Sequence, residues 1–169
     1  FYQQIEVIIP GGLKNVNCIK EFEEKKQKLF FEEKFSPEIR NAINEIRDAG
    51  VKICISSGNF QQLLDNYIHK EGLEFDYILG HKPDFAKGHA HFNYILKKTG
   101  VKPVEILYIG DSIKDGEKAL ECGIKFIAVT GITSKNDFEK HFENICVIDK
   151  IRELPGLLKK ASTGYKYLK

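Results

Sequence analysis

Segments with the apolar spacing of a helix alternate with short apolar runs from residue 36 onward, and the runs are typical of buried strands. In the first helical segment, apolar residues recur at intervals of three and four positions between residues 39 and 46. Ser36 supplies an N-cap and Pro37 occupies the first helical position, while Gly50 is suited to end the helix. This segment therefore opens a regular series of elements.

The same pattern repeats along the rest of the chain. It predicts strands at residues 51–55, 75–79, 104–109, 126–129 and 145–148. It predicts helices, after the first, at residues 61–69, 87–98, 116–122, 136–142 and 151–161. Strands that alternate with helices of this length favour an α/β fold, a doubly wound parallel sheet of the Rossmann-like kind with helices on both faces. Right-handed crossovers would place every strand-to-helix loop at one edge of that sheet.

The first 35 residues do not follow this pattern. Residues 19–33 predict a Lys- and Glu-rich helix, and residues 5–9 form a strand-like run before the breaker Pro10-Gly11-Gly12. We therefore expect a helical appendage, or the end of an inserted cap segment, at residues 1–34. The Rossmann-like core is expected at residues 35–161 and a short tail at residues 162–169.

Composition and charge exclude several classes of protein. The chain has 169 residues, of which 42% are hydrophobic and 30% are charged, which suits one globular domain with a small appendage. No window approaches the roughly 18 consecutive apolar residues of a membrane helix. The 26 basic and 24 acidic residues are interspersed, so neither a membrane nor a nucleic acid is an expected partner.

The cysteines and the start of the chain bear on location and completeness. The four cysteines lack C-x-x-C spacing, and three lie in apolar runs, so they are expected to be reduced core residues of a cytoplasmic protein. No secretory leader is visible. The sequence contains no methionine, so Phe1 is not expected to be the first translated residue.

Three loops at the predicted carboxyl ends of strands carry polar residues, where a doubly wound sheet binds its ligands. The first contains Ser56, Ser57 and Gly58, whose hydroxyl and backbone N–H groups suit a phosphate oxygen at a helix N-terminus. On its own, this loop is more typical of a serine-rich N-cap than of a phosphate site.

The second loop carries Lys87, predicted at the start of a helix, where a cation opposes the helix dipole and an anion would offset it. Lys82, in the preceding turn, is the rival for that role, and either lysine alone is typical of a solvated surface.

The third loop is the most informative. A buried strand runs directly into Gly110-Asp111, and Asp115 follows four residues later. Two carboxylates at one sheet edge suit Mg²⁺, which prefers oxygen ligands, and burying such a pair without a cation would be costly. The structural alternative is an Asp N-cap with a surface Asp one turn later.

Together the three loops resemble those of the haloacid dehalogenase (HAD) superfamily of phosphohydrolases over residues 35–150, and the phosphoglycolate phosphatases in particular. The strand that ends in Ser56 is similar to the second motif of that family. Lys87, which precedes Asp111 by 24 residues, is similar to the third, and Gly110-Asp111-Ser112-x-x-Asp115 to the fourth.

The resemblance implies hydrolysis of a small phosphorylated metabolite through an aspartyl-phosphate, with Mg²⁺ as cofactor. Ser56, Ser57, Gly58 and Lys87 would bind the phosphoryl group, and Lys87, Asp111 and Ser56 would take part in catalysis. Asp111 and Asp115 would hold the metal ion.

The family's first motif, Asp-x-Asp-x-Thr after an opening strand, is not found. Residues 7–13 offer the strand without a carboxylate. Either the motif lies upstream of the sequence, which we favour, or the chain is a non-catalytic relative that binds phosphate or a partner. A receiver-like signalling domain is a weaker alternative, because its acids and lysine occur in another order. His89 and His91 are expected at the surface or at the rim of a substrate site, since residues two apart face different sides of a helix.

Overall fold

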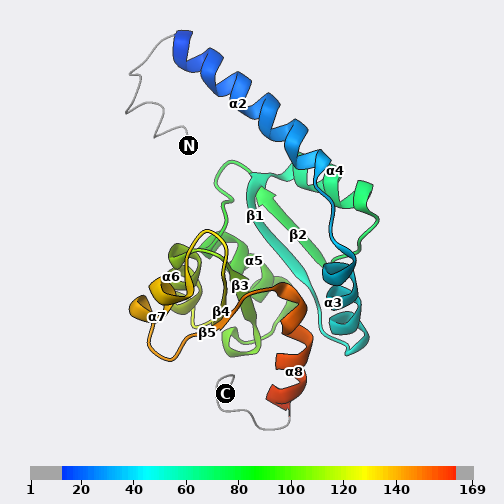
Figure 1. Cartoon of the computed structure of the whole chain (residues 1–169), viewed down its shortest axis with the longest axis vertical. Helices are drawn as coiled ribbons and strands as arrows, with labels where there is room; N and C mark the ends of the chain where they lie inside the picture. The colour runs from blue at the N-terminus through cyan, green and yellow to red at the C-terminus, as the bar shows by residue number, and fades with distance from the viewer. Residues whose placement is uncertain (1–12, 163–169) are drawn as a thin grey trace.

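The parallel α/β architecture expected from the sequence is confirmed. The computed structural model describes residues 13–162. Within this range the strands form two parallel sheets, one pairing β1 with β2 and the other ordered β3-β4-β5 (Figure 1). The strands are β1 (Cys54–Phe60), β2 (Tyr77–His81), β3 (Leu107–Gly110), β4 (Lys125–Val129) and β5 (Cys146–Ile148).

Helices cover both faces of the three-stranded sheet. α5, α6 and α7 contribute side chains to the core on one face, and α3 and α8 contribute to the core on the other (Figure 1). The helices are α2 (Leu13–Glu32), α3 (Pro37–Asp48), α4 (Gln61–Glu71), α5 (His89–Thr99), α6 (Ile113–Glu121), α7 (Lys135–His141) and α8 (Leu154–Ser162), with 3₁₀ turns η1 (Pro103–Glu105) and η2 (Ile151–Glu153). Across residues 13–162, no helix has both the length and the apolar character needed to cross a membrane.

Several helix ends follow the capping residues of the sequence. The Ser36 hydroxyl accepts a hydrogen bond from Ile39 N at the start of α3, and Ser134 does the same for Asp137 N at the start of α7. Gly72 ends α4 in the left-handed conformation, with φ of 63°. The predicted start of α3 is confirmed, and the start of α7 and the end of α4 lie within two residues of the predicted positions.

Strand boundaries differ from the prediction. β1 begins at Cys54 rather than at residue 51, and it continues to Phe60 because Phe60 pairs with His81 across a register shift. The segment from Ser56 onward, predicted to interrupt the strand, therefore remains part of it. α6 begins at Ile113 instead of residue 116, because Ser112 caps the helix.

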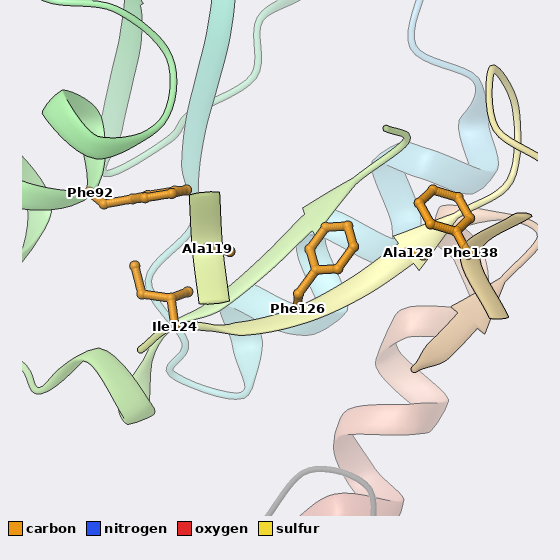
Figure 2. Close-up of a cluster of buried hydrophobic side chains, with 6 residues drawn as sticks. All are labelled: Phe92, Ala119, Ile124, Phe126, Ala128 and Phe138. Atoms are coloured by element: carbon orange, nitrogen blue, oxygen red, sulfur yellow. The ribbon is translucent and has the colours of Figure 1, made fainter. Parts of the chain in front are cut away.

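β4 is buried on both faces and organises the core. Phe126 and Ala128 point to one face, where they pack with Phe92 of α5, Ala119 of α6 and Phe138 of α7 (Figure 2). Ile127, the residue between them, is fully buried on the opposite face with Ile46, Ile148 and Leu154. Burial on both faces is the pattern of a central strand in a parallel sheet.

The cysteine prediction is partly wrong. All four thiols are free, and Cys122 and Cys146 are half-buried, but Cys18 and Cys54 are exposed. Cys18 lies on α2, which extends away from the sheets, and Cys54 begins an edge strand (Figure 1). An apolar run at a sheet edge does not guarantee burial.

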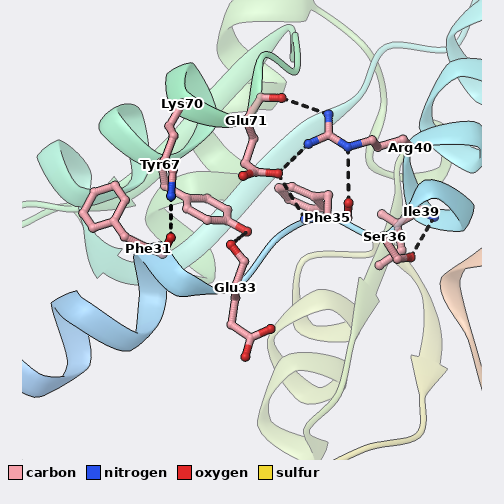
Figure 3. A network of polar contacts seen from close by, with 9 residues as sticks. All are labelled: Phe31, Glu33, Phe35, Ser36, Ile39, Arg40, Tyr67, Lys70 and Glu71. Carbon is pink, nitrogen blue, oxygen red and sulfur yellow. Dashed lines mark hydrogen bonds and ion pairs between the residues drawn. The ribbon is translucent and has the colours of Figure 1, made fainter.

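A polar network joins α3, and the link between α2 and α3, to α4. The Arg40 guanidinium donates to the Glu71 carboxylate, to the Glu71 carbonyl at 2.8 Å and to the Phe35 carbonyl at 3.2 Å (Figure 3). Glu71 also accepts from Phe35 N at 3.1 Å, and its side chain is 4% exposed. Phe35 and aromatic residues of α2 pack against Tyr67 of α4 beside this network. The link between α2 and α3 is thereby held against α4.

Arg40→Leu is expected to lower the free energy of unfolding by about 3 kcal/mol, because it leaves the buried Glu71 carboxylate without its charged partner. Urea denaturation measures this change. The control is Arg152→Ala, which removes an exposed pair with Glu38 and should cost about 1 kcal/mol or less. Equal losses of unfolding free energy in the two variants would show that the buried pair stabilises the protein no more than the exposed pair does.

Candidate active site

An ion pair joins two of the predicted site residues. Lys87 Nζ lies 3.0 Å from Asp115 Oδ2, and Asp115 is 5% exposed. Lys82 instead lies in an exposed turn, where its backbone pairs with Phe85. Of the two lysines considered from the sequence, the structure therefore brings Lys87 to the carboxylates.

The placement of Lys87 on a helix was wrong. α5 begins at His89, and Lys87 precedes its N-cap, Gly88. Gly88 has φ of 109°, and a Cβ there would lie 2.5 Å from the Lys118 side chain. Lys118 Nζ donates to the Lys87 carbonyl at 3.3 Å. A glycine and a lysine of α6 thus fix the loop that presents Lys87.

The Lys87 ammonium is kept positively charged. Burial lowers the pKa of Lys87, but Tyr108 and the hydrogen-bonded Asp115 raise it by more than burial lowers it. The pKa therefore lies above the ordinary lysine value. The group is consequently a fixed cation at neutral pH.

Tyr108 of β3 lies near both Lys87 and Ser56. Lys87 and Ser56, which lie far apart in the sequence, both lower the pKa of the Tyr108 phenol. Burial raises the pKa of Tyr108, and the charge of Lys87 offsets part of that rise. Ser56 and Lys87 are therefore within reach of one hydroxyl group.

The end of β3 places the two carboxylates. Asp111 directly follows the strand and is half-buried, and Ser112 rather than an aspartate caps α6 by accepting from Asp115 N at 3.2 Å. A Cβ on Gly110 would lie 2.7 Å from Asp115 Cβ. Glycine is needed at this position because the Asp115 side chain packs directly against the strand.

The donor chemistry of this edge fits Mg²⁺, since Asp111 and Asp115 offer carboxylate oxygens. Within residues 13–162, no group of three or more His, Cys, Asp or Glu side chains converges. A metal ion at Asp111 would therefore need further oxygen ligands from water, substrate or another segment.

Ser56, Ser57 and Gly58, here called the serine loop, lie within β1. Ser57 Oγ accepts from Asn59 N at 3.1 Å and stabilises the loop. Gly58 is exposed, with open space where a Cβ would be. α4 begins just beyond this loop without a side-chain cap, so its first N–H groups receive no side-chain acceptor from Phe60.

His91 was placed wrongly by the sequence analysis. It is fully buried, with Nδ1 2.9 Å from Ser56 Oγ, whereas His89 is at the surface as expected and pairs with Glu121 at 2.8 Å. Because α5 begins at His89, position 91 faces the sheets. His91 lies four residues before Ile95, so the two share one face of the helix. That spacing could have predicted that His91 is buried.

An apolar groove separates the two sheets. Its volume is about 530 Å³, and its walls include Ile53 and Ile55 of the β1 side and Leu107 and Ile109 of β3. Among the described strands, β1 pairs only with β2, and β3 only with β4. Each therefore has an edge that no described strand pairs, and the groove lies between strands that both run toward the site.

Gly110→Ala is expected to push the Asp115 side chain away from β3 and to lower the free energy of unfolding by about 1 to 3 kcal/mol through overpacking. Thermal unfolding checks this. Gly58→Ala is the matched control, because its Cβ meets no atom within 4 Å. Equal stability of both variants and the unchanged protein would contradict the close approach of Asp115 to Gly110.

Known proteins of similar sequence identify a family. The family model described as "Haloacid dehalogenase-like hydrolase" matches residues 4–129. The phosphoglycolate phosphatase of Synechococcus elongatus is 25% identical over 96 residues, which is 56% of this chain and 45% of that protein. The chain thus spans a little under half the length of this curated relative.

Solved structures show the same fold. A haloacid dehalogenase-like family hydrolase from Streptococcus pneumoniae has a TM-score of 0.77 and 18% identity, over 94% of this chain and 76% of that one. A mutant of CbbY from Rhodobacter sphaeroides, in complex with xylulose-(1,5)bisphosphate, has a TM-score of 0.67 and 18% identity, over 86% and 68%. The motifs, the fold and the family match agree, and the chain belongs to the haloacid dehalogenase-like hydrolase family.

Proposed function

We propose that the protein is a Mg²⁺-dependent phosphomonoester hydrolase of a small phosphorylated metabolite, acting through an aspartyl-phosphate. The observation that carries the proposal is the ion pair between Lys87 and the nearly buried Asp115, at the end of the strand that Asp111 follows. Cation, carboxylates and hydroxyl are the groups that phosphoryl transfer requires, because its catalysis is mainly positioning and electrostatic stabilisation.

Lys87 and the serine loop bind the phosphoryl group in this proposal. The Lys87 ammonium neutralises the phosphoryl oxygens and the attacking carboxylate, which would otherwise repel each other. Ser56 donates its hydroxyl hydrogen to one phosphoryl oxygen, and the exposed residue Gly58, three positions before the first residue of α4, offers its backbone N–H group. Ser57 supports this loop through Asn59.

Asp111 and Asp115 serve the metal ion. Asp111 is the direct ligand, because Asp115 already receives the Lys87 hydrogen bond and is nearly buried. Asp115 orients Lys87 and reaches the ion directly or through water. The bound ion supplies charge neutralisation at the phosphoryl oxygens.

The groove between β1 and β3 suits the strand that carries the nucleophile. A parallel strand placed there would pair with the edges of β1 and β3 that no described strand covers, and it would bury its side chains against Ile55 and Ile109. Its carboxyl end would reach the edge that holds Asp111. We propose that this strand comes from upstream of the sequence and presents an aspartate there.

The proposed reaction has two steps. The aspartate oxygen bonds to phosphorus while the bond to the ester oxygen breaks, and a proton from a second acid leaves with the alcohol. Water then attacks phosphorus and gives a proton back to the second acid, while the bond between phosphorus and the aspartate oxygen breaks, which releases inorganic phosphate and restores the carboxylate. The phosphoglycolate phosphatase relative and the bisphosphate bound by CbbY support a small sugar or acid phosphate as substrate.

Asp111→Asn in the full polypeptide is expected to reduce Mg²⁺-dependent phosphate release at least about 100-fold without unfolding the protein, because it removes the charged metal ligand. A screen of phosphoglycolate and sugar phosphates with a phosphate-release assay measures this. Asp149→Asn is the control, since Asp149 follows β5 at the same edge but bonds to Thr130. Undiminished turnover in Asp111→Asn would sink the proposed metal role.

Lys87→Met is expected to weaken binding of inorganic phosphate about 10-fold or more in isothermal titration calorimetry, because the cation that faces the phosphoryl group is lost. Lys82→Met, the same change in the neighbouring exposed turn, should leave the affinity within about twofold. Equal losses in both variants would mean that general surface charge, not the Lys87 site, attracts phosphate.

A protein that binds phosphate but releases none from any substrate would support the alternative, a non-catalytic phosphate-binding module.

A further inference from the structure

His91 is a buried polar residue that the proposed reaction leaves without a task. Its side chain has no solvent exposure, and its ring packs at 4.6 Å from the Phe85 ring, centroid to centroid. A buried imidazole costs free energy unless its nitrogen atoms find partners. Its position therefore requires a compensating interaction.

That interaction is with Ser56. His91 Nδ1 lies 2.9 Å from Ser56 Oγ, and among the described residues no group has hydrogen-bonding geometry to Nε2. The backbone carbonyls of Gly80 and Phe85 lie near the ring. The polar contact of this ring is thus directed at the serine of the proposed phosphate site.

Burial lowers the pKa of His91 and outweighs the backbone groups of Gly80 and Phe85, which raise it, so the ring is neutral. In a neutral ring one nitrogen carries the hydrogen. The contact with Ser56 is therefore one hydrogen bond between neutral groups, in which either Nδ1–H donates to Ser56 Oγ or the Ser56 hydroxyl donates to Nδ1. In either case the bond fixes the position of Ser56 Oγ.

We propose that His91 is a positioning residue for Ser56: the contact between His91 Nδ1 and Ser56 Oγ holds the serine rotamer and keeps its hydroxyl group at the phosphoryl site. The inference rests on the proposed function. It deepens that function, since it explains why a histidine, and not an aliphatic residue, fills this place in α5. Holding the hydroxyl in one geometry lowers the entropy lost when phosphate binds.

Two substitutions of similar polarity separate this role from simple packing. His91→Asn places an amide atom where Nδ1 lies, whereas His91→Gln places it near Nε2 and leaves Ser56 without the contact. Isothermal titration of the full chain with inorganic phosphate and Mg²⁺ measures the effect. We expect His91→Asn to stay within about threefold of the unchanged protein and His91→Gln to bind about five- to tenfold more weakly. Equal affinities of the two variants would overturn the inference.

A double-mutant cycle makes the test independent of stability. In the Ser56→Ala background, His91→Gln should weaken phosphate binding no further, because the residue acts through the serine. An additional loss of the same size in that background would assign His91 a packing role and overturn the inference. Thermal unfolding of each variant confirms that the folded protein is being titrated.

The cycle also separates this inference from the proposed function. If the unchanged protein binds no phosphate, the phosphate site itself is wrong. Both the proposed function and the role of His91 are then contradicted. If the unchanged protein binds phosphate and Lys87→Met abolishes binding while His91→Gln does not, only the role of His91 fails.

Discussion

The ion pair between Lys87 and Asp115 is the interaction around which the site is built. It joins the loop before α5 to the first turn of α6, two segments separated by a complete helix and strand. Two glycines are required by it: Gly110 makes room for the Asp115 side chain, and Gly88 lets Lys118 pack beneath the loop. Each charge offsets the cost of burying the other, and breaking the pair would leave a nearly buried carboxylate alone.

The core holds the two ends of this pair in place. Phe92 of α5 and Ala119 of α6 pack in the same cluster with Phe126 of β4 (Figure 2). The helices that follow the two loops are therefore held by one hydrophobic core. Tight packing of this kind transmits small displacements instead of absorbing them. Phosphoryl transfer depends on positioning, and a rigid core beneath the loops meets that requirement.

Local sequence signals identified most of the fold and the charged part of the site. Capping serines and glycines placed the helices, and Gly110-Asp111 after an apolar strand located the carboxylates. The burial of His91 against Ser56, and the position of Tyr108 near Lys87, were not visible, because each depends on segments distant in the sequence. The extent of β1 was missed for the same reason, since strand pairing with β2, not residue type, carries it to its end.

The proposed reaction requires this edge to form an aspartyl-phosphate with an aspartate from a strand in the groove between β1 and β3. The most direct test is rapid acid quenching of the full polypeptide with Mg²⁺ and phosphoglycolate or a sugar phosphate that it hydrolyses, followed by tandem mass spectrometry. We expect the mass spectrum to show a phosphorylated aspartate in a peptide outside residues 13–162. Turnover without any phosphorylated aspartate, or phosphate found on Ser56, would contradict it.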